Sequence, residues 1–249
     1  MSAVSVLILA GSRGGDDPMT RGENVAHKAL IEIDGEPMIA RVLRALWDCP
    51  SIGHIAISAS NPDCLSPVCG QTEILPAASS PSTSVMRAAK YLGTPLLVTT
   101  ADHALLQAEW ISYFLSHLPD ADIVAAVARE EIINAALPET QRTYLRFRDQ
   151  AISGCNLFYL ANDKALNAVQ FWQSLEADRK APIKLLRKLG PVFALRYALG
   201  RLTLSDALEA LGQRAGAKPG LVDMPFGLAA VDVDKPSDLA LVRAHIGTE

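Results

Sequence analysis

The chain has 249 residues, of which 49% are hydrophobic and 20% charged, and these proportions exclude a disordered or collagen-like chain. Its 23 basic and 27 acidic residues give a net charge of −4, whereas proteins that coat nucleic acid without sequence preference are usually basic. The longest apolar run near the start, Val4–Ala10, is far shorter than the roughly 20 residues of a membrane span. We therefore expect a cytoplasmic protein that binds no nucleic acid.

Strands and helices alternate through the first half of the chain. The run Val4–Ala10 is almost continuously apolar and ends at Gly11, as expected of a strand buried on both faces. By the same pattern, we predict strands at 54–59, 95–100 and 122–128 and helices at 37–46, 84–92 and 109–118. This alternation predicts an α/β fold with a mostly parallel sheet.

The second half is less regular. Short strands are predicted at 143–147, 152–159, 221–224 and 229–233, and helices at 162–175 and 236–246. Residues 181–215 are predicted to be almost entirely helical, with breaks at Gly190 and Gly200. We expect one domain over 1–249 that contains a helical insert at 179–218.

The insert is unusually basic. Residues 179–218 hold nine basic and two acidic side chains, a net charge of +7, which leaves −11 for the rest of the chain. Apolar residues interleave with these charges. Two interpretations stay open: an amphipathic helical cap with a solvated basic face, or a surface for a phosphorylated or membrane-bound acceptor, because basic amphipathic helices lie on anionic interfaces.

A glycine-rich loop follows the first strand. The segment Leu9-Ala10-Gly11-Ser12-Arg13-Gly14-Gly15 would present backbone N–H groups to an anion, and glycine allows the close approach that this needs. Arg13 and Lys28 are candidates to neutralise a polyphosphate. The segment is neither a Walker A loop nor a G-x-G-x-x-G dinucleotide fingerprint.

Acidic residues follow two later apolar segments. Asp102 ends the predicted strand 95–100, where it is placed either to hold Mg²⁺ against phosphates or to cap a helix. Alternation along the predicted strand 229–233 puts Asp232 and Asp234 on the same face. Asp238 suits the first turn of the closing helix.

Together these segments resemble the MobA-like nucleotidyltransferases, which include molybdenum-cofactor guanylyltransferase, and more distantly the sugar and isoprenoid cytidylyltransferases. The matching motifs are the Leu-Ala-Gly loop with Arg13 and Lys28, the Gly-Glu-Pro-Met-Ile turn at 35–39, Asp102, and the acidic segment 232–239. Ser12 stands where the family usually has a second glycine. Fourteen residues separate Arg13 from Lys28, so that Arg21 is an alternative phosphate ligand.

The resemblance implies a Rossmann-like, GT-A-like nucleotidyltransferase fold. It also implies Mg²⁺-dependent transfer of a nucleoside monophosphate from CTP or GTP to a phosphorylated small-molecule or lipid acceptor, with release of pyrophosphate. Lys28, Arg13, Asp102 and Asp234 would be catalytic, and Asp102 and Asp234 would hold the metal, with Asp232 a less favoured ligand. The nucleotide would contact Leu9, Ala10, Gly11, Ser12, Arg13, Gly14, Lys28, Ser84 and Asp102.

Two parts of this assignment have structural alternatives. Ser84 is either a contact to the base or ribose or the N-cap of its helix. Arg142, Arg146, Gly154 and Asn156 are the acceptor-binding candidates, but the arginines also suit an exposed edge strand blunted by charge.

Two other functions fit parts of the pattern. A glycosyltransferase would share the sheet and a metal-binding carboxylate but consume a nucleotide-sugar. A catalytically silent nucleotide-binding regulator has no need of Lys28, Asp102 and Asp234 together. The basic insert adds an expected peripheral contact with the inner membrane face.

Overall fold

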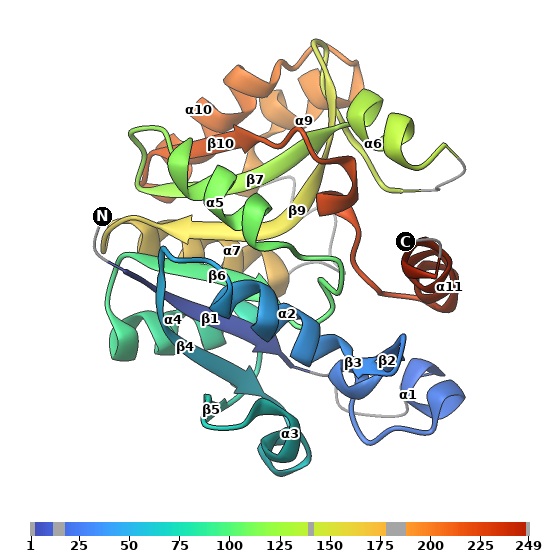
Figure 1. Cartoon of the computed structure of the whole chain (residues 1–249). Coiled ribbons are helices and arrows are strands. Elements are labelled where there is room, and N and C mark those ends of the chain that lie inside the picture. Colours follow the sequence, from blue (N-terminus) through green and yellow to red (C-terminus); the bar gives the residue numbers. More distant parts are fainter. Residues whose placement is uncertain (1–2, 12–17, 139–141, 178–187, 248–249) are drawn as a thin grey trace.

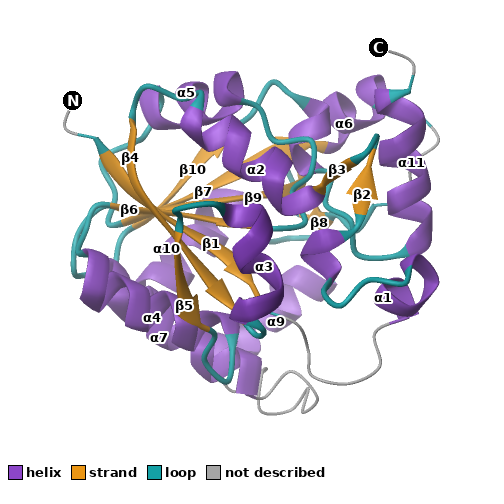
Figure 2. Cartoon of the chain, turned by 60° about the horizontal axis from the view of Figure 1, so that its bottom comes forward, coloured by secondary structure: helices purple, strands orange, loops and turns teal. Residues whose placement is uncertain are grey.

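Parallel strands of mostly apolar residues form the middle of a large sheet with helices on both faces (Figures 1 and 2). The computed structural model describes residues 3–11, 18–138, 142–177 and 188–247. The strand order is β10-β7-β9-β6-β1-β4-β5, with β8 paired to β9. All pairs on this path are parallel except those of β9 with β6 and β7. The predicted α/β fold with a mostly parallel sheet is confirmed.

The strands of the sheet are β1 (Val4–Ala10), β4 (Ile52–Ala59), β5 (Glu73–Pro76), β6 (Leu96–Thr100), β7 (Ile123–Arg129), β8 (Leu145–Arg146), β9 (Ala151–Leu160) and β10 (Pro219–Asp223). A separate hairpin pairs β2 (Glu32–Ile33) with β3 (Glu36–Pro37). The helices are α1 (Pro18–Glu23), α2 (Met38–Trp47), α3 (Pro62–Cys69), α4 (Pro81–Leu92), α5 (Ala108–Ser116), α6 (Glu130–Ala136), α7 (Ala165–Ala177), α9 (Pro191–Ala198), α10 (Leu204–Ala215) and α11 (Pro236–Ile246), with 3₁₀ turns η1 (Lys28–Leu30) and η2 (Gly227–Ala230).

Alternating side chains of the central strands supply two hydrophobic cores. Along β1, Val6 and Ile8 pack into the larger core with α2, α5, η2 and α11, whereas Leu7 packs into the smaller core with α4 and α7. Helices α4 and α7 lie together on that second face (Figure 2). A strand buried on both faces therefore needs its apolar run to be nearly continuous, as the run in β1 is.

The sheet register places the candidate site at one edge. Leu9 is level with Thr100 of β6, and Ala10 is level with Ala59 of β4. The loop after β1 and the residues after β6 therefore begin side by side at the carboxyl ends of parallel strands. That edge is where open α/β sheets bind their ligands.

The predicted strand at 229–233 is wrong. Residues 227–230 form the 3₁₀ turn η2, and the extended segment after it joins no strand of the sheet. Its backbone instead contacts the turn after β6, where Val233 N donates to Asp102 O at 3.0 Å. The predicted strand at 143–147 shrinks to the two residues of β8, and the hairpin, α3 and α6 were not predicted.

The described part of the predicted insert is largely helical, and its standing as a subdomain stays a prediction. Helix α9 lies between Gly190 and Gly200, where we predicted breaks, and α10 lies between Gly200 and β10. Both glycines have positive φ. Residues 178–187, which carry part of the basic charge, lie outside the described residues. In the described part, no residue of α9 is buried, and Val192, Leu195 and Leu199 are exposed.

Several of the insert's described basic side chains have protein partners. Arg196 pairs with Asp206, Lys218 pairs with Asp120, and Lys188 donates to the carbonyl of Ser174. These pairs leave less free positive charge than the sequence count suggests, and membrane contact stays a prediction. None of the helices in the described part of the chain is both long and apolar enough to cross a membrane.

Gly227→Ala is expected to destabilise the protein by about 1–3 kcal/mol, the usual cost of overpacking a core. Gly227 is buried where η2 crosses α6, and an added Cβ would press on the carbonyl oxygen of Ile132 and lie 2.8 Å from the Cβ of Ala136. The measurement is the free energy of unfolding in urea.

The control for this prediction is Gly22→Ala. Gly22 lies inside α1, and nothing is within 4 Å of an added Cβ. Because alanine favours helix over glycine, this variant should match the wild type or gain up to about 1 kcal/mol. Equal stability of the two variants would contradict the packing assigned to η2.

Candidate active site

Lys28 joins two carboxylates that are distant in sequence. Its Nζ lies 2.7 Å from Asp102 Oδ2 and 2.9 Å from Asp234 Oδ1. The side chains of Lys28 and Asp102 are about four-fifths buried, at 19% and 22% exposure, whereas that of Asp234 is 67% exposed. The three residues predicted to be catalytic in the described chain are therefore brought together.

His27 fixes the start of the turn that carries Lys28. Its side chain is buried, and its Nδ1 accepts a hydrogen bond from Ala29 N at 3.1 Å, which caps η1. Its Nε2 lies 3.3 Å from Ser60 Oγ, after β4. Sequence reasoning missed this residue, although its place directly before Lys28 was a usable signal.

Asp102 lies in a tight turn and does not cap a helix. The next helix, α5, begins only at Ala108, so the capping alternative is wrong. The backbone carbonyl of Asp102 accepts the hydrogen bond from Val233 N. This bond aligns the segment before α11 with the end of β6 and brings Asp234 to Lys28.

Opposing effects set the pKa of Lys28. Burial lowers the pKa, but the neighbouring carboxylates of Asp102 and Asp234 outweigh burial and hold the pKa above its ordinary value. Lys28 is therefore protonated at neutral pH. A charged ammonium at this edge of the sheet is a donor for phosphate oxygens.

The donor set fits a magnesium ion. Asp102 Oδ1 is buried and has no hydrogen-bond partner, although it is one of the two oxygens of a charged group. Asp234 Oδ1 approaches the same ammonium. Mg²⁺ is usually bound by one or two carboxylates together with substrate phosphates, and it does not need an all-protein cage. Accordingly, the described residues contain no cluster of three or more acidic, His or Cys ligands.

Asp232 faces a different group from Asp234. It accepts hydrogen bonds from Arg142 Nη2 and, at 3.0 Å, from Asn156 Nδ2. The segment is not a strand, yet its burial alternates as predicted, with Val231 and Val233 buried and Asp232 and Asp234 not; the two carboxylates nevertheless have different partners. Burial raises the pKa of Asp232, but Arg142 and Asn156 hold it below its ordinary value. Asp232 is thus an anion paired with an arginine.

A bulge in β9 aims Asn156 at Asp232. The pairing of β7 with β9 shifts between Ala125–Phe158 and Val127–Gly154, so β9 carries extra residues there. Asn156 lies in this bulge with φ +48°, a left-handed conformation that is uncommon for a residue other than glycine. Bulges of this kind often re-aim side chains next to active sites.

His103 lies close to both Asp102 and Asp232. It is fully buried, and burial lowers its pKa to about 4, against the opposing effect of the carboxylates of Asp102 and Asp232. The imidazole is therefore neutral at physiological pH. A neutral ring fully buried in the core is consistent with a structural role for His103.

The remaining predicted residues differ in how closely they approach this site. Leu9, Ala10 and Gly11 end β1 at the site edge, whereas Ser12, Arg13 and Gly14 lie outside the described residues. Arg21, the alternative phosphate ligand, is in the last turn of α1.

Ser84 does not cap its helix. Ser80 caps α4 by accepting from Thr83 N, and Ser84 Oγ accepts from Ala78 N at 2.9 Å. Its hydroxyl therefore holds the loop before α4, and its contact with a base or ribose stays a prediction.

The acceptor candidates have different partners. Arg142 pairs with Asp232, whereas Arg146 makes two 2.8 Å hydrogen bonds to Glu130 on α6 and is exposed. Gly154 lies in β9 with open space where a Cβ would be. Arg142 and Asn156 converge on one point, and Arg146 does not join them there.

Comparisons with solved structures support the fold. A hypothetical transferase from Thermus thermophilus matches with 29% identity and a TM-score of 0.83, over 95% of this chain and 99% of that one. CMP:2-keto-3-deoxy-manno-octonic acid synthetase, solved with CTP, matches with 14% identity and a TM-score of 0.60, over 100% and 99%. A 4-diphosphocytidyl-2C-methyl-D-erythritol synthase from Anaerococcus prevotii matches with 11% identity and a TM-score of 0.60, over 99% and 96%.

Comparison with family models gives a more specific result. No curated protein matches the chain. Residues 6–222 match the model of the MobA-like NTP transferase domain, which spans the sheet from β1 to β10. The match agrees with the nucleotidyltransferase-like fold. The chain therefore belongs to the MobA-like NTP transferase domain family, a family of nucleotidyltransferases.

Proposed function

We propose that this protein transfers a nucleoside monophosphate from a nucleoside triphosphate to a phosphorylated acceptor, with Mg²⁺, and releases pyrophosphate. The observation that carries the proposal is the bridge from Lys28 to Asp102 and Asp234, beside the loop after β1. A cation and two carboxylates at the carboxyl edge of parallel strands are the groups that a metal–triphosphate complex needs.

The reaction is an in-line displacement at phosphorus. An oxygen of the acceptor phosphate forms a bond to the α-phosphorus while the bond from that phosphorus to the bridging oxygen of the β-phosphate breaks. The electron pair of the broken bond leaves with pyrophosphate. Because the attacking oxygen is already anionic, no general base is needed.

The chain's own residues supply position and charge. Protonated Lys28 donates to the phosphates, and Asp102 and Asp234 would hold Mg²⁺ through the oxygens that Lys28 leaves open. When bound, the metal adds positive charge where negative charge develops. In phosphoryl transfer such positioning and neutralisation supply most of the rate enhancement.

We assign the acceptor phosphate to the group formed by Arg142, Asn156 and Asp232. Arg142 is largely buried, at 13% side-chain exposure, and its Nε has no hydrogen-bond partner. Arg142 and Asn156 already converge on one anion, the carboxylate of Asp232. A phosphate, which is also an anion with several acceptor oxygens, would bind these donors in place of Asp232, with two-point geometry from the guanidinium.

The deciding experiment offers the four nucleoside triphosphates with Mg²⁺ and a panel of phosphorylated polyols, sugars and lipids, and measures pyrophosphate. We expect release with CTP or GTP, and the CTP bound in the solved synthetase makes CTP the first to test. Turnover of a nucleotide-sugar without pyrophosphate would instead identify a glycosyltransferase. Tight nucleotide binding with no turnover on any acceptor would identify a silent regulator.

Arg142→Gln is expected to raise the KM for the phosphorylated acceptor by about 10- to 100-fold, since a hydrogen bond to a charged group contributes about 1.5–3 kcal/mol. The KM for the nucleotide should change less than about twofold, which corresponds to a loss of roughly 0.4 kcal/mol or less at the group formed by Lys28, Asp102 and Asp234. Steady-state kinetics with each substrate varied in turn make the measurement.

Arg146→Gln is the matched control for Arg142→Gln. Its guanidinium is bound to Glu130 and not to Asp232, so its effect on the acceptor KM should be much smaller. A larger effect at Arg146 than at Arg142 would move the acceptor site to β8 and contradict our assignment.

A further inference from the structure

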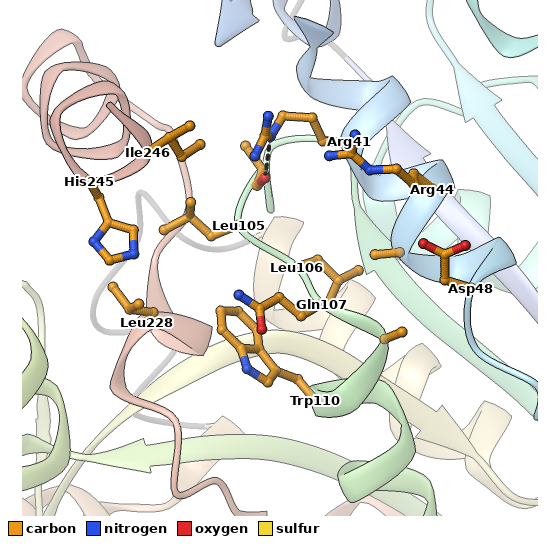
Figure 3. Close-up of a pocket in the computed structure, with 13 residues that line it drawn as sticks. Arg41, Arg44, Asp48, Leu105, Leu106, Gln107, Trp110, Leu228, His245 and Ile246 are labelled. Atoms are coloured by element: carbon orange, nitrogen blue, oxygen red, sulfur yellow. Dashed lines mark hydrogen bonds between the residues drawn. The ribbon is translucent and has the colours of Figure 1, made fainter. Parts of the chain in front are cut away.

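A second network ties together the segments that carry Lys28 and Asp102. Arg41, in α2, donates from Nε to the carbonyl oxygen of Ala104 at 3.1 Å and from Nη1 to Glu36 Oε2 at 3.4 Å. Its side chain is 16% exposed and lines a cavity of about 260 Å³ between α2, residues 104–110 and α11 (Figure 3).

Each contact of Arg41 stands close in sequence to a residue of the active site. Ala104 is two residues after Asp102, in the turn that directly follows, and no other backbone N–H in the described part of the chain donates to its carbonyl. Glu36 opens β3 of the hairpin that directly follows the turn carrying Lys28, and Met38 N bonds back to Ile31 O at 3.0 Å. Arg41 therefore links the two loops on the far side of the Lys28–Asp102 pair.

Asp102 depends on such support because few contacts fix it. Among the described residues its carboxylate has one hydrogen-bond partner, Lys28, and its second oxygen has none. The direction of the side chain is therefore set largely by the turn that Arg41 holds. Residues that orient a metal-binding group typically matter 10- to 100-fold for affinity or activity.

We propose that Arg41 is a positioning residue that holds Asp102 in line for a metal-bound nucleotide. The inference rests on the proposed function of the site. It assigns Arg41 no contact with substrate. It predicts that the effect of losing Arg41 on Mg²⁺-dependent nucleotide binding acts through Asp102.

Arg44 provides a matched control within the same cavity. It lies one turn further along α2 and shares the same Glu36 oxygen, at 2.9 Å, but it makes no recorded contact with Ala104 and is 55% exposed. The pair Arg41 and Arg44 therefore differs in the link to the Asp102 turn, while charge and residue type are the same.

The test is a double-mutant cycle of Arg41→Gln with Asp102→Asn, with Arg44→Gln as the control. Nucleotide affinity is measured by calorimetry with Mg²⁺ and again with EDTA, on the full chain. Arg41→Gln should weaken binding of the Mg²⁺ complex about 10-fold or more and change metal-free binding less than about twofold. In the Asp102→Asn background the same change should have almost no further effect.

The outcomes separate the inference from the function on which it rests. Equal losses with and without metal, or a full effect of Arg41→Gln in the Asp102→Asn background, would show a merely structural role and overturn the inference. An effect of Arg44→Gln as large as that of Arg41→Gln would overturn it too. If Asp102→Asn itself leaves Mg²⁺-dependent binding and turnover intact, the proposed function fails, and the inference fails with it.

Arg41→Lys adds a conservative variant, which keeps the charge but can reach only one of the two partners. We expect the thermal stability of Arg41→Lys to lie closer to that of the wild type than its Mg²⁺-dependent nucleotide affinity does. Full recovery of both would show that charge alone suffices and that the link between the two loops is not needed.

Discussion

Asp102→Asn should lower the rate of nucleotidyl transfer by about a thousandfold, which corresponds to ~4 kcal/mol of lost transition-state stabilisation. The substitution keeps the shape of the side chain and removes its charge. Asp102 is the more buried of the two carboxylates on Lys28, and it holds the free oxygen that would face the metal. Pyrophosphate release at saturating nucleotide and Mg²⁺ measures the effect.

Asp120→Asn is the matched control for this change. Asp120 is a fully exposed aspartate that pairs with Lys218 on the surface, so its loss should leave both turnover and folding unchanged. Asp102→Asn should keep a cooperative thermal transition, so that the loss of rate is not a loss of fold. Turnover within a few fold of the wild type would remove Asp102 from the reaction.

The central strands of the sheet were predictable because they are buried on both faces, whereas the less buried β5 was not predicted. Runs such as Val4–Ala10 and 95–100 are almost wholly apolar, and the sequence offers no other way to bury them. Residues 62–69 and 130–136 were missed as helices because both are short, and α3 has a proline inside it. Short helices are stabilised by tertiary packing rather than by a pattern that the sequence displays.

The residues of the candidate site were predictable where a motif or the end of a strand marks them. Lys28 and Asp102 were both identified from a motif and a strand terminus, and they lie 2.7 Å apart. That Asp232 and Asp234 have different partners was not predictable from alternation. It depends on the tight packing of Gly227 against α6 and on the backbone bond from Val233 to Asp102, both of which are long-range contacts.

Asn156 and Arg41 illustrate the same limit. The bulge that aims Asn156 at Asp232 is visible only in the register of β7 and β9, and in a positive φ. The link from Arg41 to Ala104 spans 63 residues and ends on a backbone carbonyl, which has no sequence signature. Groups that orient other groups are therefore the part of the site that sequence patterns show least.

Lys28→Met should weaken nucleotide binding by about 10- to 100-fold and slow transfer by at least as much. A charge-assisted hydrogen bond to phosphate contributes about 1.5–3 kcal/mol, and each roughly 1.4 kcal/mol is a factor of ten. Methionine keeps the length and apolar stem of lysine and removes the ammonium. Lys90→Met, on the exposed last turn of α4, is the control for loss of a surface charge.

Lys28→Met should bind Mg²⁺ alone more tightly than the wild type does, although it binds nucleotide more weakly. Without nucleotide, the Lys28 ammonium lies 2.7 and 2.9 Å from the two carboxylates that would bind the metal, so lysine and metal compete for them. Removing the ammonium leaves two negative charges side by side, which raises their affinity for a divalent cation. Calorimetric titration with Mg²⁺ alone should therefore show tighter binding to Lys28→Met than to the wild type. Loss of affinity for both Mg²⁺ and nucleotide would instead mean that Lys28 only holds the site together, because a merely structural lysine has no reason to move the two affinities in opposite directions.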